Sequence, residues 1–144
     1  LGLDVGINYN EQDFSGIVKE RTNGAGVNVV LDMVGAPYWE RNIASLALWG
    51  RMVLVGAIGG SRLETSLSLL MPKRLRVQGT TLRSRTLEEK IALTGQLRQH
   101  VLPLIADGRI VAVVDRTFPL ENVAEAHEYM ESNANFGKIV LTME

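Results

Sequence analysis

The sequence predicts an α/β protein built mainly on a parallel β-sheet. Segments typical of buried strands alternate with segments typical of helices along the first part of the chain. One of these strands, Val27–Val34, carries apolar side chains on both alternating faces. A strand of this kind is covered on both sides, as strands of parallel sheets are. The alternation therefore indicates βαβ units.

The elements of the first half follow in order. A short strand is expected at Ile7–Tyr9, and a helix over Phe14–Arg21 has acidic residues near its start and basic residues near its end, as the helix dipole favours. Asn23–Gly26 breaks this helix before the buried strand Val27–Val34 begins. The elements expected next are a helix over Tyr38–Leu48, a strand at Met52–Val55, a helix over Thr65–Lys73 and a strand at Leu75–Leu82.

The pattern changes after Ser84. Thr86 and Glu89 form a capping-box pattern, which predicts the start of a long helix. Pro103 should interrupt this helix, and Asp107-Gly108 should end it. The elements expected after it are a strand at Ile110–Phe118, a helix over Glu121–Glu131 and a strand at Lys138–Met143.

The composition excludes several classes of protein. Hydrophobic residues make up 46% of the chain, which argues against disorder, and the net charge of -1 gives no basic excess for nucleic acid or a membrane surface. The chain has no cysteine, which excludes disulfides and fits a reducing compartment, so we expect a cytoplasmic location. Because the first residue is leucine, not methionine, we expect the chain to be part of a longer protein.

The ends of three consecutive predicted strands suit a ligand crevice. Ligands of open parallel sheets bind outside the carboxyl ends of the strands. These ends fall at Val34-Gly35, Gly56–Gly60 and Leu82–Ser84, and glycine lets the backbone approach a ligand closely. The glycines could instead only make tight turns, and Asp32 could bond nearby backbone instead of a ligand. Three strand ends in register favour the crevice.

The main phosphate anchor of a dinucleotide is missing from these residues. No G-x-G-x-x-G motif opens a helix after a strand, and Gly24–Gly26 precedes a strand, which is the wrong context for binding pyrophosphate. Neither His100 nor His127 has a second ligand at metal spacing, so we assign no metal site. No Ser/His/Asp arrangement occurs, and we assign no catalytic residue.

Several segments occur in an order and spacing typical of one family. They are Leu1–Asp4, Ile7–Tyr9, Gly26–Gly35, Leu46–Gly56, Leu82–Arg85, Ala126–Glu131 and Gly137–Leu141. Together they resemble the medium-chain dehydrogenase/reductase superfamily, and the last three narrow the resemblance to its quinone oxidoreductase (zeta-crystallin-like) branch. The resemblance covers essentially the whole chain.

The resemblance implies that the chain contributes to two different domains. Residues 1–85 would form the second half of an NADP-binding, Rossmann-like domain with an incomplete parallel sheet, and residues 86–144 would return to a GroES-like catalytic domain. The missing strands would leave Val27–Val34 as a hydrophobic edge, which invites pairing with another chain. We therefore expect stability only with the missing half, as an oligomer or after rearrangement.

The resemblance also carries over cofactor contacts, position by position. Tyr9 matches a tyrosine whose hydroxyl helps bind the adenosine 2′-phosphate, which favours NADPH over NADH. Val34 and Gly35 match positions that line the adenosine and ribose side, and Gly56, Ala57, Ile58 and Gly59 match the loop beside the nicotinamide ribose. Leu82, Arg83 and Ser84 match the strand end that meets the nicotinamide amide. Asn135 matches a C-terminal position close to the cofactor.

The function that the resemblance implies is an NADPH-dependent oxidoreductase. It would pass reducing equivalents from the nicotinamide to an electron-poor quinone or enone without zinc, the protein mainly orienting cofactor and acceptor. A homodimer is expected to form through the strand at Leu75–Leu82. Two alternatives stay open: an inactive fragment acting only as a structural or dimerisation module, and a relative of the zinc-dependent alcohol dehydrogenases.

Overall fold

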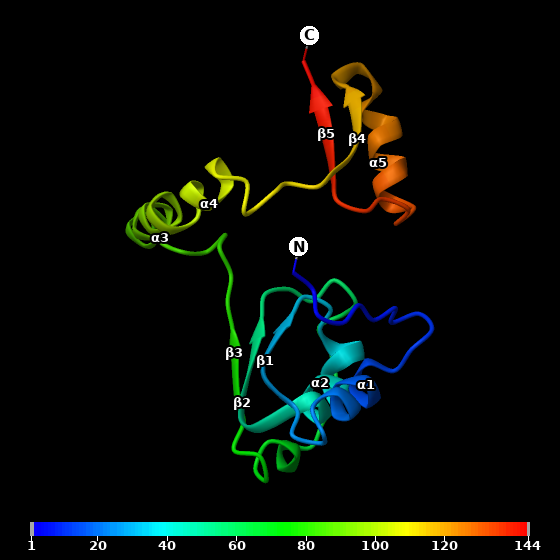
Figure 1. Cartoon of the computed structure of the whole chain (residues 1–144), viewed down its shortest axis with the longest axis vertical. Helices are drawn as coiled ribbons and strands as arrows, with labels where there is room; N and C mark the ends of the chain where they lie inside the picture. The colour runs from blue at the N-terminus through cyan, green and yellow to red at the C-terminus, as the bar shows by residue number, and fades with distance from the viewer. Residues whose placement is uncertain (1, 144) are drawn as a thin grey trace. The chain divides into compact units, whose positions relative to one another are not determined.

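The computed structural model describes residues 2–143, so Leu1, which opens the resemblance, and Glu144 lie outside the described residues. The chain divides into two compact units, one of Leu3–Lys90 and one that comprises Gly2 and the residues from Ile91 onward. Figure 1 labels the elements of both units. The assignment of residues 1–85 and 86–144 to two domains of a larger enzyme stays a prediction.

A parallel sheet forms the centre of the first unit, as predicted. Its strands are β1 (Val27–Asp32), β2 (Leu46–Leu54) and β3 (Arg76–Gly79), in the order β1-β2-β3 with parallel pairing throughout. Within the described residues, no strand pairs with the second edge of β1. The expectation that both faces of this strand are buried is wrong. Val30 packs against the core, but Val29 and Leu31 on the opposite face are 50% and 62% exposed, because no described element covers that face.

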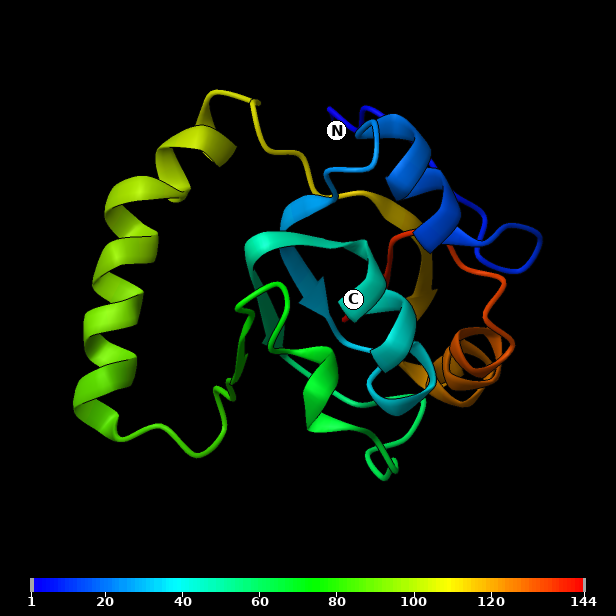
Figure 2. The ribbon, with the colours of Figure 1, turned by 90° about the horizontal axis from the view of Figure 1, so that it is seen from below.

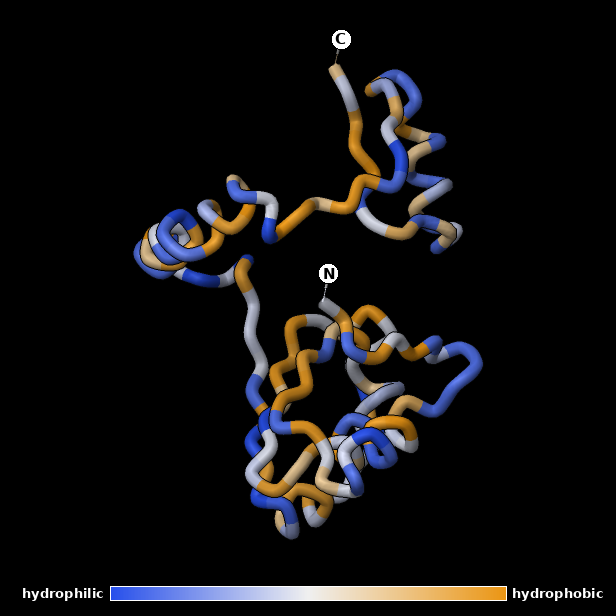
Figure 3. Tube along the Cα trace, in the orientation of Figure 1, coloured by the Kyte–Doolittle hydropathy of each residue, from blue (hydrophilic) through white to orange (hydrophobic). Residues whose placement is uncertain are grey.

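Two helices, one before β1 and one after it in the chain, contribute to this unit. They are α1 (Phe14–Arg21) and α2 (Trp39–Ser45), with the 3-10 helix η1 (Ala36–Tyr38) directly before α2. The helices contact one another, and Figure 2 shows them side by side. Ile43, Leu46 and Met52 form the buried core between α2 and β2, and Figure 3 shows hydrophobic residues gathered along β1 and β2.

Asp13 caps the amino end of α1, whose bounds agree with the prediction. Its carboxylate accepts hydrogen bonds from the backbone N–H groups of Ser15 at 3.2 Å and Gly16 at 3.1 Å. The Ser15 hydroxyl also donates to it, at 2.9 Å. These donors favour the charged form, and the Ser15 hydroxyl makes the largest contribution to lowering the pKa of Asp13 below its ordinary value.

We expect Asp13→Ala to lower the stability of α1, and Asp13→Asn to keep most of the cap, because an amide oxygen also accepts these bonds. The folded pKa of Asp13 lies below the unfolded one, so its ionic contribution is present above about pH 3.9 and is lost as the pH falls through the folded pKa. Urea denaturation between about pH 7 and pH 3 measures this loss. An equal pH dependence for the native chain and Asp13→Asn would contradict the assignment.

The predicted helix over Tyr38–Leu48 is too long, because α2 ends at Ser45 and β2 begins at once. The cause is a contact distant in sequence. The Lys73 Nζ donates to the carbonyl oxygens of Ile43, Ala44 and Leu46, at 3.1, 2.8 and 2.6 Å, and so caps the end of α2. The backbone N–H of Trp49 then donates to the Lys73 carbonyl at 2.7 Å.

Two further predicted elements differ from the structure. Ile7–Tyr9 forms no strand and leads into a turn, because no described strand lies beside it. Thr65–Lys73 holds only the 3-10 helix η2 (Leu67–Leu69) and turns. The Ser66 hydroxyl accepts from the Ser68 N–H at 3.3 Å, and such local bonds compete with an α-helix. The strand expected at Leu75–Leu82 is shortened to β3.

The second unit contains a parallel strand pair. Its strands are β4 (Val114–Pro119) and β5 (Lys138–Thr142), connected by the 3-10 helix η3 (Leu120–Asn122) and α5 (Val123–Glu131). The strand expected from Ile110 therefore begins four residues late, at Val114.

A helix in two pieces links the sheets along the chain. The pieces are α3 (Leu87–His100) and α4 (Leu102–Ala106), and the interruption before Pro103 is as predicted. The capping box is confirmed by two reciprocal bonds, from the Thr86 N–H to Glu89 at 2.9 Å and from the Glu89 N–H to the Thr86 hydroxyl at 3.3 Å. Over residues 2–143, no helix has the length and apolar character needed to cross a bilayer.

Candidate functional site

The loops that follow β1 and β2 are held side by side by backbone hydrogen bonds. The Val55 N–H donates to the Asp32 carbonyl at 2.8 Å, which extends the β1–β2 pairing. The Gly59 N–H donates to the Val34 carbonyl at 2.9 Å, and the Ala36 N–H donates to the Gly60 carbonyl at 2.9 Å. The structure therefore brings together two predicted groups of site residues, Val34-Gly35 and Gly56–Gly59.

Gly35 occupies a position that no other residue fits. Its φ of +90° lies in the region that favours glycine, and a Cβ there would lie 2.5 Å from the Gly60 carbonyl oxygen and 2.9 Å from the Ala57 Cβ. The buried Asp32 fixes the same turn, since its carboxylate accepts from the N–H groups of Val34 at 2.8 Å and Gly35 at 3.1 Å. Asp32 therefore bonds nearby backbone, one of the two interpretations left open by the sequence.

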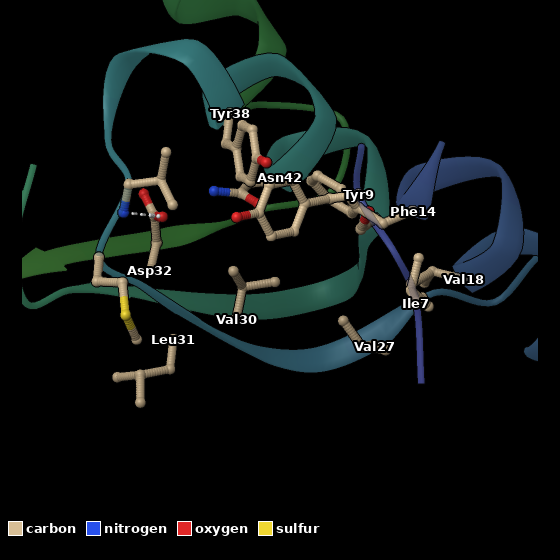
Figure 4. A pocket seen from close by; sticks show the side chains of 13 residues that line it. Ile7, Tyr9, Phe14, Val18, Val27, Val30, Leu31, Asp32, Tyr38 and Asn42 are labelled. Carbon is tan, nitrogen blue, oxygen red and sulfur yellow. Dashed lines mark hydrogen bonds between the residues drawn. The ribbon is translucent and has the colours of Figure 1, made fainter. Parts of the chain in front are cut away.

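Tyr9 lies at a hollow on the helix side of β1 (Figure 4). Its ring meets the Tyr38 ring edge-on, with centroids 6.1 Å apart, and the Arg41 guanidinium lies 4.5 Å from the centre of the Tyr38 ring. The hollow has a volume of about 450 Å³. Val34 lines it as well, so the structure places these two predicted cofactor residues at one cavity.

The third strand end carries polar groups. The Thr80 N–H donates to the Leu54 carbonyl at 2.9 Å, which aligns the exit of β3 with the end of β2. Arg85 Nε then donates to the Thr81 carbonyl at 3.1 Å and shapes the turn that contains Leu82, Arg83 and Ser84. Ser84 lines a separate hollow of about 560 Å³, which the first two strand ends do not share.

Asn135 belongs to the second unit. Its side-chain nitrogen donates to the Gly137 carbonyl at 3.1 Å, in the turn before β5. The structure therefore gives Asn135 a local role, and a contact with a cofactor stays a prediction. Cofactor contacts of the other residues of the predicted site stay predictions as well.

Asn42 is a residue of the hollow that the sequence analysis missed. It is buried on α2, with 4% of its surface exposed, and its Nδ2 has no hydrogen-bond partner. The signal was present in the spacing, because Asn42 lies three residues from both Trp39 and Ser45 and so shares the inward face of a helix with them. A polar side chain at that position requires a partner.

The described residues do not fit a zinc ion. Within residues 2–143, no group of three or more histidine, cysteine, aspartate or glutamate side chains is arranged to hold a metal. What the strand ends offer instead is exposed backbone beside glycine, an aromatic ring at Tyr9 and polar groups after β3. Such groups can bind a ribose, an amide or a planar ring, which are parts of a dinucleotide.

A family model described as "Zinc-binding dehydrogenase" matches residues 1–141. The chain belongs to this family. It therefore lies within the medium-chain dehydrogenase/reductase superfamily, and the resemblance stated from the sequence is confirmed.

Some of the proteins that are similar to this chain are quinone oxidoreductases. The chain is 28% identical over 143 residues to bovine (Bos taurus) "Quinone oxidoreductase-like protein 2", covering 99% of the chain and 41% of the relative. It is 36% identical over 140 residues to "Quinone oxidoreductase 1" of Escherichia coli K12, covering 94% and 42%. The structure of the Escherichia coli quinone oxidoreductase complexed with NADPH matches with a TM-score of 0.76 and 35% identity, covering 95% and 42%. The chain thus spans about two fifths of the length of these relatives.

Proposed function

We propose that this chain supplies part of the NADPH site of an oxidoreductase that passes reducing equivalents to a quinone or enone. The observation that carries the proposal is the pair of joined loops after β1 and β2, in which Gly35 must be glycine and backbone is presented at the carboxyl ends of parallel strands. This is where open parallel sheets bind nucleotides. The similarity to an NADPH complex over 95% of the chain supports the same choice of cofactor.

The residues of this chain would bind and orient the cofactor. Tyr9 would donate its hydroxyl to the 2′-phosphate, while Val34 and Gly35 would contact the adenosine and its ribose. The loop Gly56–Gly59 would lie along the nicotinamide ribose, and Leu82–Ser84 would meet the nicotinamide amide. The bound cofactor supplies the hydride. The proposed reaction uses no zinc, and the proposed location is the cytoplasm.

We also propose that two copies pair through β3. In the sheet order β1-β2-β3, the outer edge of β3 has no strand beside it within the described residues. An unpaired strand edge presents N–H and C=O groups that an identical strand can satisfy across a twofold axis. Sedimentation equilibrium tests this, and a monomer at the concentrations of the cofactor titration would contradict it.

The test is a titration of the chain with NADPH, followed by cofactor fluorescence, with NADH as the parallel ligand. We expect tighter binding of NADPH. Tyr9→Phe should weaken NADPH binding by about tenfold, the effect of one hydrogen bond to a charged group, and leave NADH binding unchanged. Tyr129→Phe is the matched control, because the Tyr129 hydroxyl bonds Asp115 at 2.8 Å in the second unit.

Each result of the titration decides between the functions considered. Equal loss of NADPH and NADH binding in Tyr9→Phe would contradict contact with the 2′-phosphate. No binding of either dinucleotide would contradict the proposal and favour a structural module. Because the described residues do not fit a zinc ion, the zinc-dependent alcohol dehydrogenase alternative is tested by a metal assay on a longer protein that contains this chain, where stoichiometric zinc would favour it.

A further inference from the structure

Asn23, at the end of α1, is the one asparagine of the sequence that is followed directly by glycine. The side-chain amide of an asparagine can be attacked by the backbone nitrogen of the next residue. Glycine lets this nitrogen approach closely, because it has no Cβ. Both Asn23 and Gly24 are exposed, and a Cβ added at Gly24 would meet nothing within 4 Å. This turn therefore has the residues and the space for a cyclic imide to form.

The backbone of the same turn forms a Schellman motif. The Asn23 N–H donates to the Glu20 carbonyl at 3.2 Å, and the Gly24 N–H donates to the Lys19 carbonyl at 2.7 Å. Asn23 has a φ of +51°, the left-handed conformation that the motif places directly after the helix cap. The nitrogen that would attack Asn23 is therefore the donor of the bond that closes the helix.

We propose that Asn23 is a site of spontaneous deamidation, gated by the hydrogen bond between Gly24 and Lys19. The Gly24 nitrogen, after losing its proton to hydroxide, bonds to the Asn23 Cγ, and the Cγ–Nδ2 bond breaks. The Nδ2 group takes a proton from water and leaves as ammonia. Water then opens the cyclic imide at either carbonyl, which leaves aspartate or isoaspartate at this position.

Opening of the last turn of α1 controls the rate of this modification. While the Gly24 N–H donates to the Lys19 carbonyl, the nitrogen keeps its proton and cannot attack. Exchange of this amide hydrogen with water requires the same opening, and the ends of helices open at low free energy. The native fold should therefore slow deamidation by the factor by which it protects the Gly24 N–H from exchange.

Modification should loosen the turn between α1 and β1. Isoaspartate adds a methylene group to the backbone of a turn that is closed by two bonds, from the Ala25 N–H to the Thr22 carbonyl at 3.0 Å and from the Gly26 N–H to the Thr22 hydroxyl at 2.8 Å. A Cβ at Gly26 would lie 2.7 Å from the Ser45 carbonyl oxygen, so the backbone has no room to move toward α2. Either product also places a negative charge at the carboxyl end of α1, which the helix dipole disfavours.

The test follows the native chain during prolonged incubation at mildly alkaline pH, beside a sample that is unfolded in guanidinium chloride. Peptide mapping by mass spectrometry locates each conversion of an amide to an acid and separates aspartate from isoaspartate. We expect conversion at Asn23 in both samples, and slower conversion in the native chain. Hydrogen exchange of the Gly24 N–H, measured by NMR on the fresh chain, gives the factor with which this slowing should agree.

Asn133 provides a control within the same chain. It is exposed, follows α5 with a φ of +55°, and its N–H donates to the Met130 carbonyl at 3.2 Å, as that of Asn23 does to Glu20. The next residue is Ala134, whose Cβ hinders attack by its nitrogen. We expect conversion at Asn133 to be at least about tenfold slower, which corresponds to about 1.4 kcal/mol in activation free energy.

Asn23→Gly separates the modification from the motif. Glycine is the residue preferred at this left-handed position, so the motif persists without a side chain that can react. In the native chain, the modified fraction should exchange the amide hydrogens at the end of α1 about fivefold faster, the effect of one lost hydrogen bond. Asn23→Gly should show no such change over the same incubation.

Three results would overturn the assignment. They are conversion at Asn23 that is no faster than at Asn133, a native rate that does not follow the protection of the Gly24 N–H, and a modified fraction whose α1 exchanges no faster than before incubation. The first removes the site, the second removes the gate and the third removes the effect on the turn. No step involves a cofactor or an acceptor, so the result of the NADPH titration neither supports nor contradicts this modification.

Discussion

Gly35→Ala is expected to lower the free energy of unfolding of the first unit by about 3 kcal/mol or more. The substitution combines a backbone conformation that costs about 1–3 kcal/mol for a residue with a Cβ and an overpacking cost of similar size. The new Cβ would lie 2.5 Å from the Gly60 oxygen and 3.0 Å from the Ala57 Cα. Both are backbone atoms, so relief requires the two loops to separate. Urea denaturation measures the loss.

Gly60→Ala is the control for this experiment. Gly60 has a φ of +128°, and a Cβ added there would meet nothing within 4 Å. Its substitution should therefore show backbone strain alone, about 1–2 kcal/mol. A Gly35→Ala variant no less stable than Gly60→Ala would show that the loops tolerate separation. The joined loops would then not be the rigid feature on which the proposed cofactor site depends.

Leu46→Ala should lower the free energy of unfolding by about 2–5 kcal/mol, the range for truncating a large aliphatic side chain in a core. Leu46 is fully buried and packs with Ile43 and Met52. It also stands where α2 ends and β2 begins, and its carbonyl accepts from Lys73 at 2.6 Å. The cavity would therefore loosen the junction that positions the strand leading to Gly56–Gly59.

Leu48→Ala removes the same atoms from the same strand at a site that is 53% exposed. We expect a loss below about 1 kcal/mol, because little apolar surface is transferred from water there. Thermal or urea denaturation of both variants gives the comparison. Similar losses would mean that the small buried cluster around Leu46 does not dominate the stability of this unit.

Local chemistry explains the elements that the sequence predicts correctly. Phe14–Arg21 is bounded by a carboxylate cap at its start and a glycine-containing break at its end, and both act within a few residues. The Thr86 and Glu89 capping box is equally local. The run of apolar residues in Val27–Val34 predicts a parallel strand, and β1 pairs with β2 in parallel as expected. The expected burial of both faces is wrong, because only the face that carries Val30 packs against the core.

Two of the predictions that failed depend on distant partners. The end of α2 is set by Lys73, whose ammonium group caps carbonyl oxygens 27 to 30 residues away in the chain. The predicted end of this helix at Leu48 was therefore three residues too late. Ile7–Tyr9 has the residues of a strand, but a strand needs a neighbour with which to share its hydrogen bonds.

The features of the candidate site also divide into those that the local sequence predicts and those that depend on distant contacts. The sequence by itself determined which strand ends carry glycine and polar groups, and through the order of its motifs it determined the family. Only the tertiary structure decided that the loops after β1 and β2 are joined, that Ser84 lines a hollow of its own, and that Asn42 is buried without a partner. The physical reason is that a hydrogen bond between segments, or the lack of one, depends on distances that no local pattern records.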